Sequence, residues 1–221
     1  MPKNQTLLAS RIMLEFETGD FNQGKELLDR MVETMAEAEP GPTAVFAYTA
    51  AAIPLVARIE GGKERFDVAN VAARNFLSFE SLSPMFASLV AMSVGMMAAE
   101  QGDRITVTEQ YTALLPERGT ILTALLPSVD RILGIMSTAV GDLDQAVSHF
   151  EEALAFCRKA GYRPELAWTC CDYADTLLER DGEGDQATAT ALLDESLAIS
   201  SELGMRPLME RVLDRQKGLE P

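Results

Sequence analysis

Residues 133–156 read LGIMSTAVGDLDQAVSHFEEALAF. Apolar residues recur with helical periodicity on both sides of Gly141-Asp142, which predicts two helices joined by a tight turn. Gly134 is small enough to let the second helix approach closely, Ala146 suits the crossing point, and Phe150 fills the wedge beyond it. We therefore expect a closely packed helical hairpin.

The same turn signal returns along the chain at intervals of 39 to 43 residues, as Gly-Asp at 19–20, 102–103, 141–142 and 184–185 and as Gly-Gly at 61–62. A period of this length is typical of helical repeat proteins. We predict an all-α, right-handed α-solenoid that spans residues 1–221 as one domain. Its five hairpins are expected at residues 5–39, 43–79, 84–117, 122–161 and 164–204, with a C-terminal capping helix at 207–216. Pro54 lies inside an expected helix, where it predicts a kink or a break.

The chain is strongly acidic. It has 221 residues, of which 34 are acidic and 19 basic, giving a net charge of −15 and a pI near 4.5. Such a surface repels a phosphate backbone, so we expect no nucleic-acid partner, and basic or neutral partners fit better. Alternatively, the acidic surface serves only to keep the protein soluble.

The chain shows no sign of export or membrane insertion. Its N-terminus lacks the apolar core of a secretory signal, so we expect a cytoplasmic protein. Residues 81–99 carry no charge, but they include serines, a proline and a glycine and precede a repeat turn, which favours a buried helix over a membrane span. Cys157, Cys170 and Cys171 provide no disulfide framework and are expected to be reduced.

The spacing of Gly134, Gly141-Asp142, Ala146, Phe150 and Ala153 resembles the tetratricopeptide repeat. Further on, YADTLLERDG (173–182), ALLDESL (191–197) and ELGM (202–205) resemble the closing repeats of bacterial MalT-like and adenylate-cyclase-linked signalling ATPases. The resemblance is good over residues 133–213 and only architectural before that. It implies a sensor-type region that receives a partner protein or a small inducer. No phosphate loop, cyclase segment or basic helix-turn-helix is present, so the ATPase, cyclase and DNA-binding activities of those proteins are not expected here.

In the tetratricopeptide register, the first helix of each hairpin lines a concave groove. The residues that this register places there are Tyr48, Arg58, Met92, Met96, Arg131, Thr138, Trp168, Cys171 and Asp175. We expect the groove to bind a peptide or a partner helix, with affinity from the aromatic and methionine side chains and selectivity from the charged ones. Alternatively, the same groove receives a small organic acid, whose carboxylate Arg58 or Arg131 would hold. A third interpretation is that the methionines and Trp168 are core residues.

Enzymatic function is the least expected reading. The sequence has no Gly-x-Ser-x-Gly elbow, phosphate loop or Cys-x-x-Cys pair, so we predict no catalytic residues, no cofactor and no metal. His149 is the single histidine, too few for an ordinary zinc site. A Cys-His nucleophilic pair would need Cys170 or Cys171 to approach it through packing.

The first hairpin offers a possible dimer surface. Leu7, Leu8 and Ile12 would face solvent if the chain is a fragment without an upstream neighbour, and they would then promote a homodimer.

Overall fold

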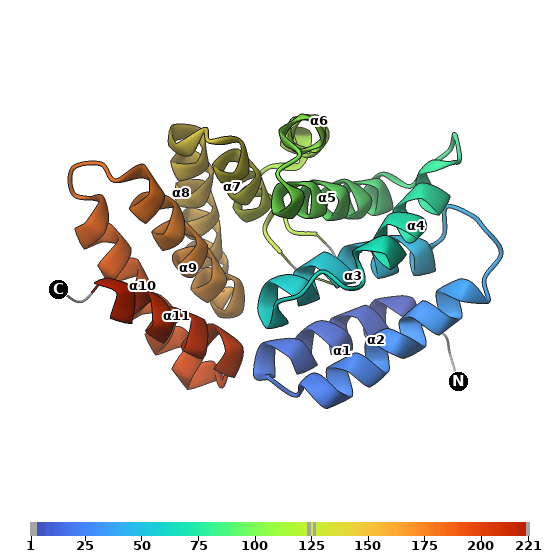
Figure 1. The fold of residues 1–221 in the computed structure, drawn as a ribbon, viewed down its shortest axis with the longest axis horizontal. Coiled ribbons are helices and arrows are strands. Elements are labelled where there is room, and N and C mark those ends of the chain that lie inside the picture. Colours follow the sequence, from blue (N-terminus) through green and yellow to red (C-terminus); the bar gives the residue numbers. More distant parts are fainter. Residues whose placement is uncertain (1–3, 123–124, 126, 220–221) are drawn as a thin grey trace. The chain divides into compact units, whose positions relative to one another are not determined.

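The protein is all-helical in the residues that the computed structural model describes, 4–122, 125 and 127–219. These residues form eleven α-helices and one short 3-10 helix, with no named strand among them (Figure 1). The all-α prediction is confirmed. The helices are α1 (Gln5–Thr18), α2 (Phe21–Ala36), α3 (Ala44–Glu60), α4 (Phe66–Leu77), α5 (Pro84–Gln101), α6 (Arg104–Leu114), η1 (Leu115–Glu117), α7 (Val129–Val140), α8 (Leu143–Ala160), α9 (Arg163–Arg180), α10 (Asp185–Leu203) and α11 (Arg206–Leu219).

The helices group into two compact units. The N-terminal unit contains the described residues up to Pro116 together with Leu122 and Leu125, and the C-terminal unit contains residues 117–121 and 127–219. Helices α1 to α6 thus belong to the first unit and α7 to α11 to the second. The single solenoid over residues 1–221 stays a prediction.

In the N-terminal unit, each hairpin packs its first helix against the first helix of the next. Helix α3 contacts α1, α4 and α5, and α5 also contacts α6 (Figure 1). Tyr48 on α3 joins all three first helices, because its hydroxyl lies 3.2 Å from the Thr6 hydroxyl on α1 and its ring meets Phe86 on α5 edge to face at 5.6 Å. Phe46 and Phe76 extend this core between α3 and α4.

The C-terminal unit repeats the arrangement. Helix α7 contacts α8 and α9, α9 also contacts α8 and α10, and α10 contacts α11. At the crossing of α7 and α8, a Cβ atom added to Gly134 would lie 2.9 Å from the Phe150 ring, which is too close for an ordinary contact. The predicted role of this glycine is confirmed. The Phe150 ring in turn stacks on Tyr173 of α9 at 5.5 Å.

Three of the five predicted turns share one geometry. Each glycine ends a helix at a positive φ between 74° and 81°, and the aspartate after it caps the next helix by accepting a hydrogen bond from a backbone N–H three residues on. These pairs are Gly19-Asp20, Gly102-Asp103 and Gly141-Asp142. The sequence pair therefore ends one helix and starts the next.

The fourth Gly-Asp pair, Gly184-Asp185, is different. Helix α9 ends at Asp181, which adopts the left-handed conformation itself at φ 52°, and Gly184 is the residue before α10. Asp185 is already inside α10, and the Arg180 guanidinium binds its carboxylate at 2.7 and 2.8 Å. The turn therefore lies where it was predicted, but Asp181 rather than a glycine ends the first helix, and Gly184 rather than an aspartate precedes the second.

Helix α3 continues through Pro54 without a break. Proline has no N–H to donate to the carbonyl of Ala50, four residues earlier. The Ser93 hydroxyl on α5 donates to that carbonyl instead, at 2.6 Å. The neighbouring helix thus satisfies the group that Pro54 leaves unpaired, which explains why the expected break is absent.

The helix bounds agree with most predicted hairpins. The exception is the fourth, whose first helix begins at Val129 rather than near residue 122; residues 123, 124 and 126 of that prediction lie outside the described part. The predicted cap at 207–216 is α11.

The uncharged segment 81–99 forms most of α5, and across the described residues we find no helix with the length and apolar character needed to cross a membrane.

The first hairpin exposes less apolar surface than expected. Leu7 is 66% exposed, but Leu8 is half-buried and Ile12 is fully buried. Leu14 lies about two turns after Leu7 on the same side of α1 and is 51% exposed. The homodimer stays a prediction, but the buried Ile12 is not part of an exposed surface as expected.

Candidate functional site

Helix α9 holds the C-terminal helix α11 through two arginines. The Arg211 guanidinium lies 5.3 Å from the centre of the Trp168 ring, within the range of a cation-π contact. One turn further along α11, the Arg215 guanidinium binds the Asp175 carboxylate with its Nε at 3.0 Å and a terminal nitrogen at 3.1 Å. Two residues predicted to bind a partner helix therefore contact a helix of the chain itself.

The remaining contacts of α11 set its position. Gly204 ends α10 in the left-handed conformation, and the next residue, Met205, is buried. Leu208 and Val212 are fully buried, so the apolar face of α11 is turned inward. The Gln216 amide also donates to Asp194 on α10 at 2.8 Å. Helix α11 thus packs as a short amphipathic helix with arginines at the edge of its apolar face.

The two kinds of contact differ in strength. Burying Leu208 and Val212 stabilises the packed helix by roughly 1.5–3 kcal/mol each. The side chains of Arg215 and Asp175 stay 37% and 35% exposed, so water screens their ion pair and it contributes about 1 kcal/mol at most. The apolar residues therefore supply most of the affinity, while the arginines set register and orientation.

A buried ionic network lies between α7 and the neighbouring face of α9. The Arg131 guanidinium binds Glu165 at 2.7 Å and Asp172 at 3.0 Å, and all three side chains are at most 6% exposed. The same Glu165 oxygen accepts the backbone N–H of Ser128 at 2.6 Å. Sequence reasoning named Arg131 but missed both carboxylates, because its partners lie 34 and 41 residues away.

The network leaves Arg131 firmly charged. Burial alone would lower the pKa of its guanidinium, but the charges of Glu165 and Asp172 outweigh burial and raise the pKa above the ordinary value. Burial also raises the pKa of the Glu165 carboxyl, although Arg131 opposes this effect. Because two carboxylates already bind Arg131, an acidic ligand would have to displace one of them from a site closed to water.

No family can be assigned to the chain by similarity. No protein-family model, curated protein or solved structure matches it.

Helix α9 presents separate residues to α7 and to α11. Glu165, Asp172 and Thr176 face α7, where the Thr176 hydroxyl lies 2.9 Å from the hydroxyl of Thr138. Trp168 and Asp175 face α11. At 3.6 residues per turn these two sets fall on adjacent faces of one helix. The structure thus brings Trp168 and Asp175 to one surface, and Arg131 and Thr138 to another.

Cys171 is completely buried, on the α9 face that carries Trp168 and Asp175. Burial raises the pKa of its thiol to about 12, and the nearby carboxylates of Asp172 and Asp175 act in the same direction. The same cause raises the pKa of Cys157 to about 12. A raised pKa disfavours the thiolate, the reactive form of cysteine, near neutral pH.

The predicted groove residues of the N-terminal unit are mostly hidden. Tyr48, Met92 and Met96 are each less than 5% exposed, and only Arg58, near the end of α3, is half-buried. Their burial fits the interpretation of the methionines as core residues. Any binding role for these four residues stays a prediction.

His149 pairs with a carboxylate rather than with a cysteine. Its Nδ1 lies 3.6 Å from an oxygen of Asp130, whose other oxygen accepts the backbone N–H of Gly119 at 2.6 Å. The pair borders an open cleft of about 630 Å³ that also contacts Arg118 and Lys159. Within the described ranges, no three His, Cys, Asp or Glu side chains are grouped as metal ligands would be.

Sequence reasoning missed a further cleft in the N-terminal unit, formed by residues at the end of α3 and in the loop after it. The one available signal was the Gly61-Gly62 turn, which replaces the Gly-Asp pair of the other repeats and lengthens the loop.

Proposed function

We propose that this chain is a regulatory protein-interaction module of tetratricopeptide-like hairpins, whose helix α9 captures a basic amphipathic helix of a partner protein. One observation carries the proposal: α9 already holds α11 in this manner. The Arg211 guanidinium lies over the Trp168 ring, and the Arg215 guanidinium binds the Asp175 carboxylate. Helix capture along an apolar face with spaced anchors is a common mode of recognition.

Within each unit, the contacts between neighbouring hairpins support the repeat of tetratricopeptide-like hairpins in this proposal. Side chains that bridge successive hairpins are separated by about one repeat: 42 residues for Thr6 and Tyr48, 41 for Arg131 and Asp172, and 40 for Asp175 and Arg215. This separation agrees with the 39 to 43 residues between the turn signals. Helix α11 then occupies the position that the first helix of a sixth hairpin would have.

The chemistry of α11 defines the expected partner. Arg211 and Arg215 are four residues apart and so lie on one face of the helix, next to the buried Leu208 and Val212. A partner helix with two arginines at this spacing beside an apolar stripe would make the same contacts. The net charge of −15 would attract such a helix. A role in bacterial cytoplasmic signalling, as the resemblance implies, belongs to the same proposal.

The test uses the full chain with its own α11 weakened. Trp168 is the only tryptophan, so its fluorescence reports directly on this surface. A peptide of residues 206–219 is titrated into a quadruple variant of the chain. It carries Leu208→Ala and Val212→Ala as well as Arg211→Ala and Arg215→Ala, because the apolar residues supply most of the packing of α11. We expect it to bind and to change the Trp168 emission, because the peptide restores the contacts that the chain has lost.

Two controls isolate the arginine contacts. The Lys217→Ala chain loses a charge of α11 that pairs with Asp214 on the same helix, so it should bind the peptide as weakly as the unaltered chain does. A peptide with alanine in place of both arginines should bind more weakly, because it keeps only the apolar contacts. Equal binding of this peptide, or no binding of the original peptide to the quadruple variant, contradicts the proposal.

A further inference from the structure

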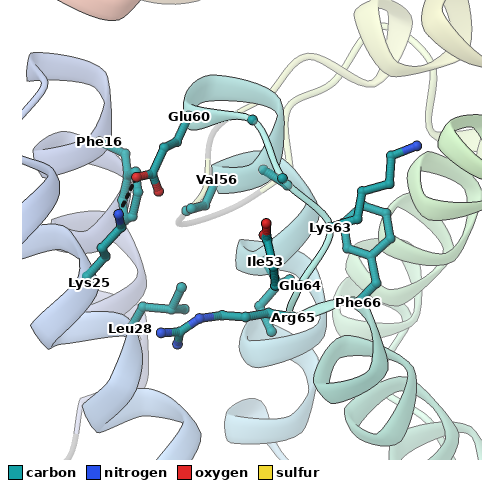
Figure 2. A pocket seen from close by; sticks show the side chains of 13 residues that line it. Phe16, Lys25, Leu28, Ile53, Val56, Glu60, Lys63, Glu64, Arg65 and Phe66 are labelled. Carbon is teal, nitrogen blue, oxygen red and sulfur yellow. Dashed lines mark ion pairs between the residues drawn. The ribbon is translucent and has the colours of Figure 1, made fainter.

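The N-terminal unit contains a cleft of about 430 Å³ between its first two hairpins (Figure 2). The floor consists of apolar side chains that are at most 6% exposed: Phe16, Leu28, Ile53, Val56 and Phe66. The loop of residues 61–65 forms one wall. A volume of this size and an apolar floor suit a small organic molecule.

The cations around the cleft are all held by carboxylates. Lys25 pairs with Glu60 across the cleft. Arg65 binds Asp29 at 2.6 Å. An anionic ligand would have to break one of these ion pairs before it could bind.

Lys63 is turned away from the cleft. Figure 2 shows its side chain pointing outward, and its ammonium lies 3.2 Å from the Glu100 carboxylate and also donates to the Glu100 backbone carbonyl. Lys63 therefore anchors the loop to the end of α5 and contributes no free positive charge to the cleft.

One carboxylate of the lining has no cation. Glu64 makes no ion pair or hydrogen bond with any residue in the described part of the chain, and Figure 2 shows its side chain on the side of the loop that faces α3. It folds back over Gly62, where a Cβ atom would collide with its carboxylate. Gly62 also has a positive φ of 89°, which other residues rarely adopt. The glycine therefore allows Glu64 to lie along the cleft.

We propose that this cleft binds a small organic cation, an amine with an apolar body. The apolar part of the ligand would cover the floor and so be removed from contact with water. Its ammonium group would bind the Glu64 carboxylate. The three ion pairs at the rim are each neutral. The carboxylate of Glu64 therefore gives the cleft one net negative charge. The acidic chain as a whole also attracts cations.

This site is separate from the proposed capture of a partner helix. It lies in the other unit and takes a different class of ligand. Failure of one proposal therefore leaves the other standing.

The test compares three ligands with the same body on the full chain: phenethylamine, phenethyl alcohol and 3-phenylpropionate. Methyl NMR signals of Ile53 and Val56 report on the floor of the cleft. We expect phenethylamine to shift these signals saturably and to bind about fivefold more tightly than the other two, as one exposed ion pair allows.

Variants of the chain test whether Glu64 causes the preference for the amine. Glu64→Gln should abolish the preference for the amine, and it should not disturb folding because Glu64 is exposed. Glu33→Gln on α2 removes another exposed carboxylate outside the cleft and should leave the preference intact. Ala57→Leu adds a side chain to the lining and should weaken binding of all three ligands.

Three outcomes would overturn the proposal. The first is binding of 3-phenylpropionate as tight as that of the amine. The second is a preference for the amine that survives Glu64→Gln. The third is no saturable shift with phenethylamine up to about 10 mM, because a ligand of this size in a matching cleft should bind below that concentration.

Discussion

Ser93 on α5 donates its hydroxyl, at 2.6 Å, to the Ala50 carbonyl that Pro54 leaves without a helical donor. Both Ser93 and Ala50 are completely buried, so water cannot take the place of the hydroxyl. A buried carbonyl without a donor destabilises a fold by about 1–3 kcal/mol. The proline of one repeat and the serine of the next are therefore energetically coupled.

Ser93→Ala should lower the free energy of unfolding by about 1–3 kcal/mol, because the Ala50 carbonyl then loses its donor. In the Ser93→Ala background, Pro54→Ala should restore part of this loss, since alanine supplies an N–H to the same carbonyl. Urea unfolding followed by circular dichroism completes the double-mutant cycle. Ser88→Ala is the matched control, because that exposed hydroxyl bonds only within its own helix. Additive effects of the two substitutions would refute the coupling.

Gly134→Ala should destabilise the C-terminal unit by about 1–3 kcal/mol through overpacking against Phe150, even though alanine is the better helix former. Gly218→Ala on α11 is the control, because a Cβ atom there meets nothing within 4 Å. It should be neutral or slightly stabilising. Unfolding followed by Trp168 fluorescence measures both, since Trp168 lies in the same unit. Equal effects at the two positions would show that packing at Gly134 is loose.

The sequence predicted features that local spacing encodes. Gly134 and Phe150 lie on two helices joined by one short turn, so helical periodicity alone brings them together. The position of the C-terminal helix followed in the same way from Gly204 and the apolar residues after it. By contrast, Pro54 was expected to disturb its helix because its compensating donor, Ser93, is supplied by another repeat.

The candidate site was predictable only in part. Trp168 and Asp175 were chosen from the repeat register, and they do lie together on α9, but their occupant α11 was expected only as a cap. Arg131 was expected to face an open groove. Its burial against Glu165 and Asp172 depends on which helix faces turn toward each other, and periodicity does not specify this when a helix is buried on several sides.

Arg131→Met should lower the free energy of unfolding by about 3–5 kcal/mol, because Glu165 and Asp172 then remain buried without a cation. Without the guanidinium, which opposes the effect of burial, the pKa of the Glu165 carboxyl rises further above its unfolded value. A raised folded pKa favours folding below the unfolded pKa near 4 and disfavours it as pH rises. The deficit of the variant should therefore be larger at pH 7 than at pH 4.5, as denaturant unfolding at the two values can measure.

The control for Arg131 is Arg163→Ala, which removes an exposed arginine bound to Glu202 on the surface. Its effect should be much smaller, because water screens that pair. Replacing Arg131, Glu165 and Asp172 together by apolar residues should recover most of the stability lost in Arg131→Met. If Arg131→Met is no worse than Arg163→Ala, the network does not stabilise the fold as the geometry indicates.

The three cysteines should react with a thiol reagent only when the C-terminal unit opens. Cys157, Cys170 and Cys171 are completely buried, and burial raises the pKa of each thiol above its ordinary value, to about 12 for Cys157 and Cys171. At pH 8 the folded chain should resist the aromatic disulfide reagent DTNB, and labelling should accelerate with urea in step with the Trp168 fluorescence. Rapid labelling of the native chain would contradict this burial.

The same pKa shifts predict that stability declines in alkaline solution. A thiol whose pKa is raised by folding contributes its stabilisation fully below the unfolded pKa near 8.5 and loses it as pH rises toward about 12. The urea midpoint of the C-terminal unit should therefore fall between pH 8 and about pH 10. Cys157→Ala removes one of the titrating thiols, so its midpoint should fall less steeply over that interval, even if the variant is less stable at pH 8. An identical slope would mean that the thiols ionise alike in the folded and unfolded chains.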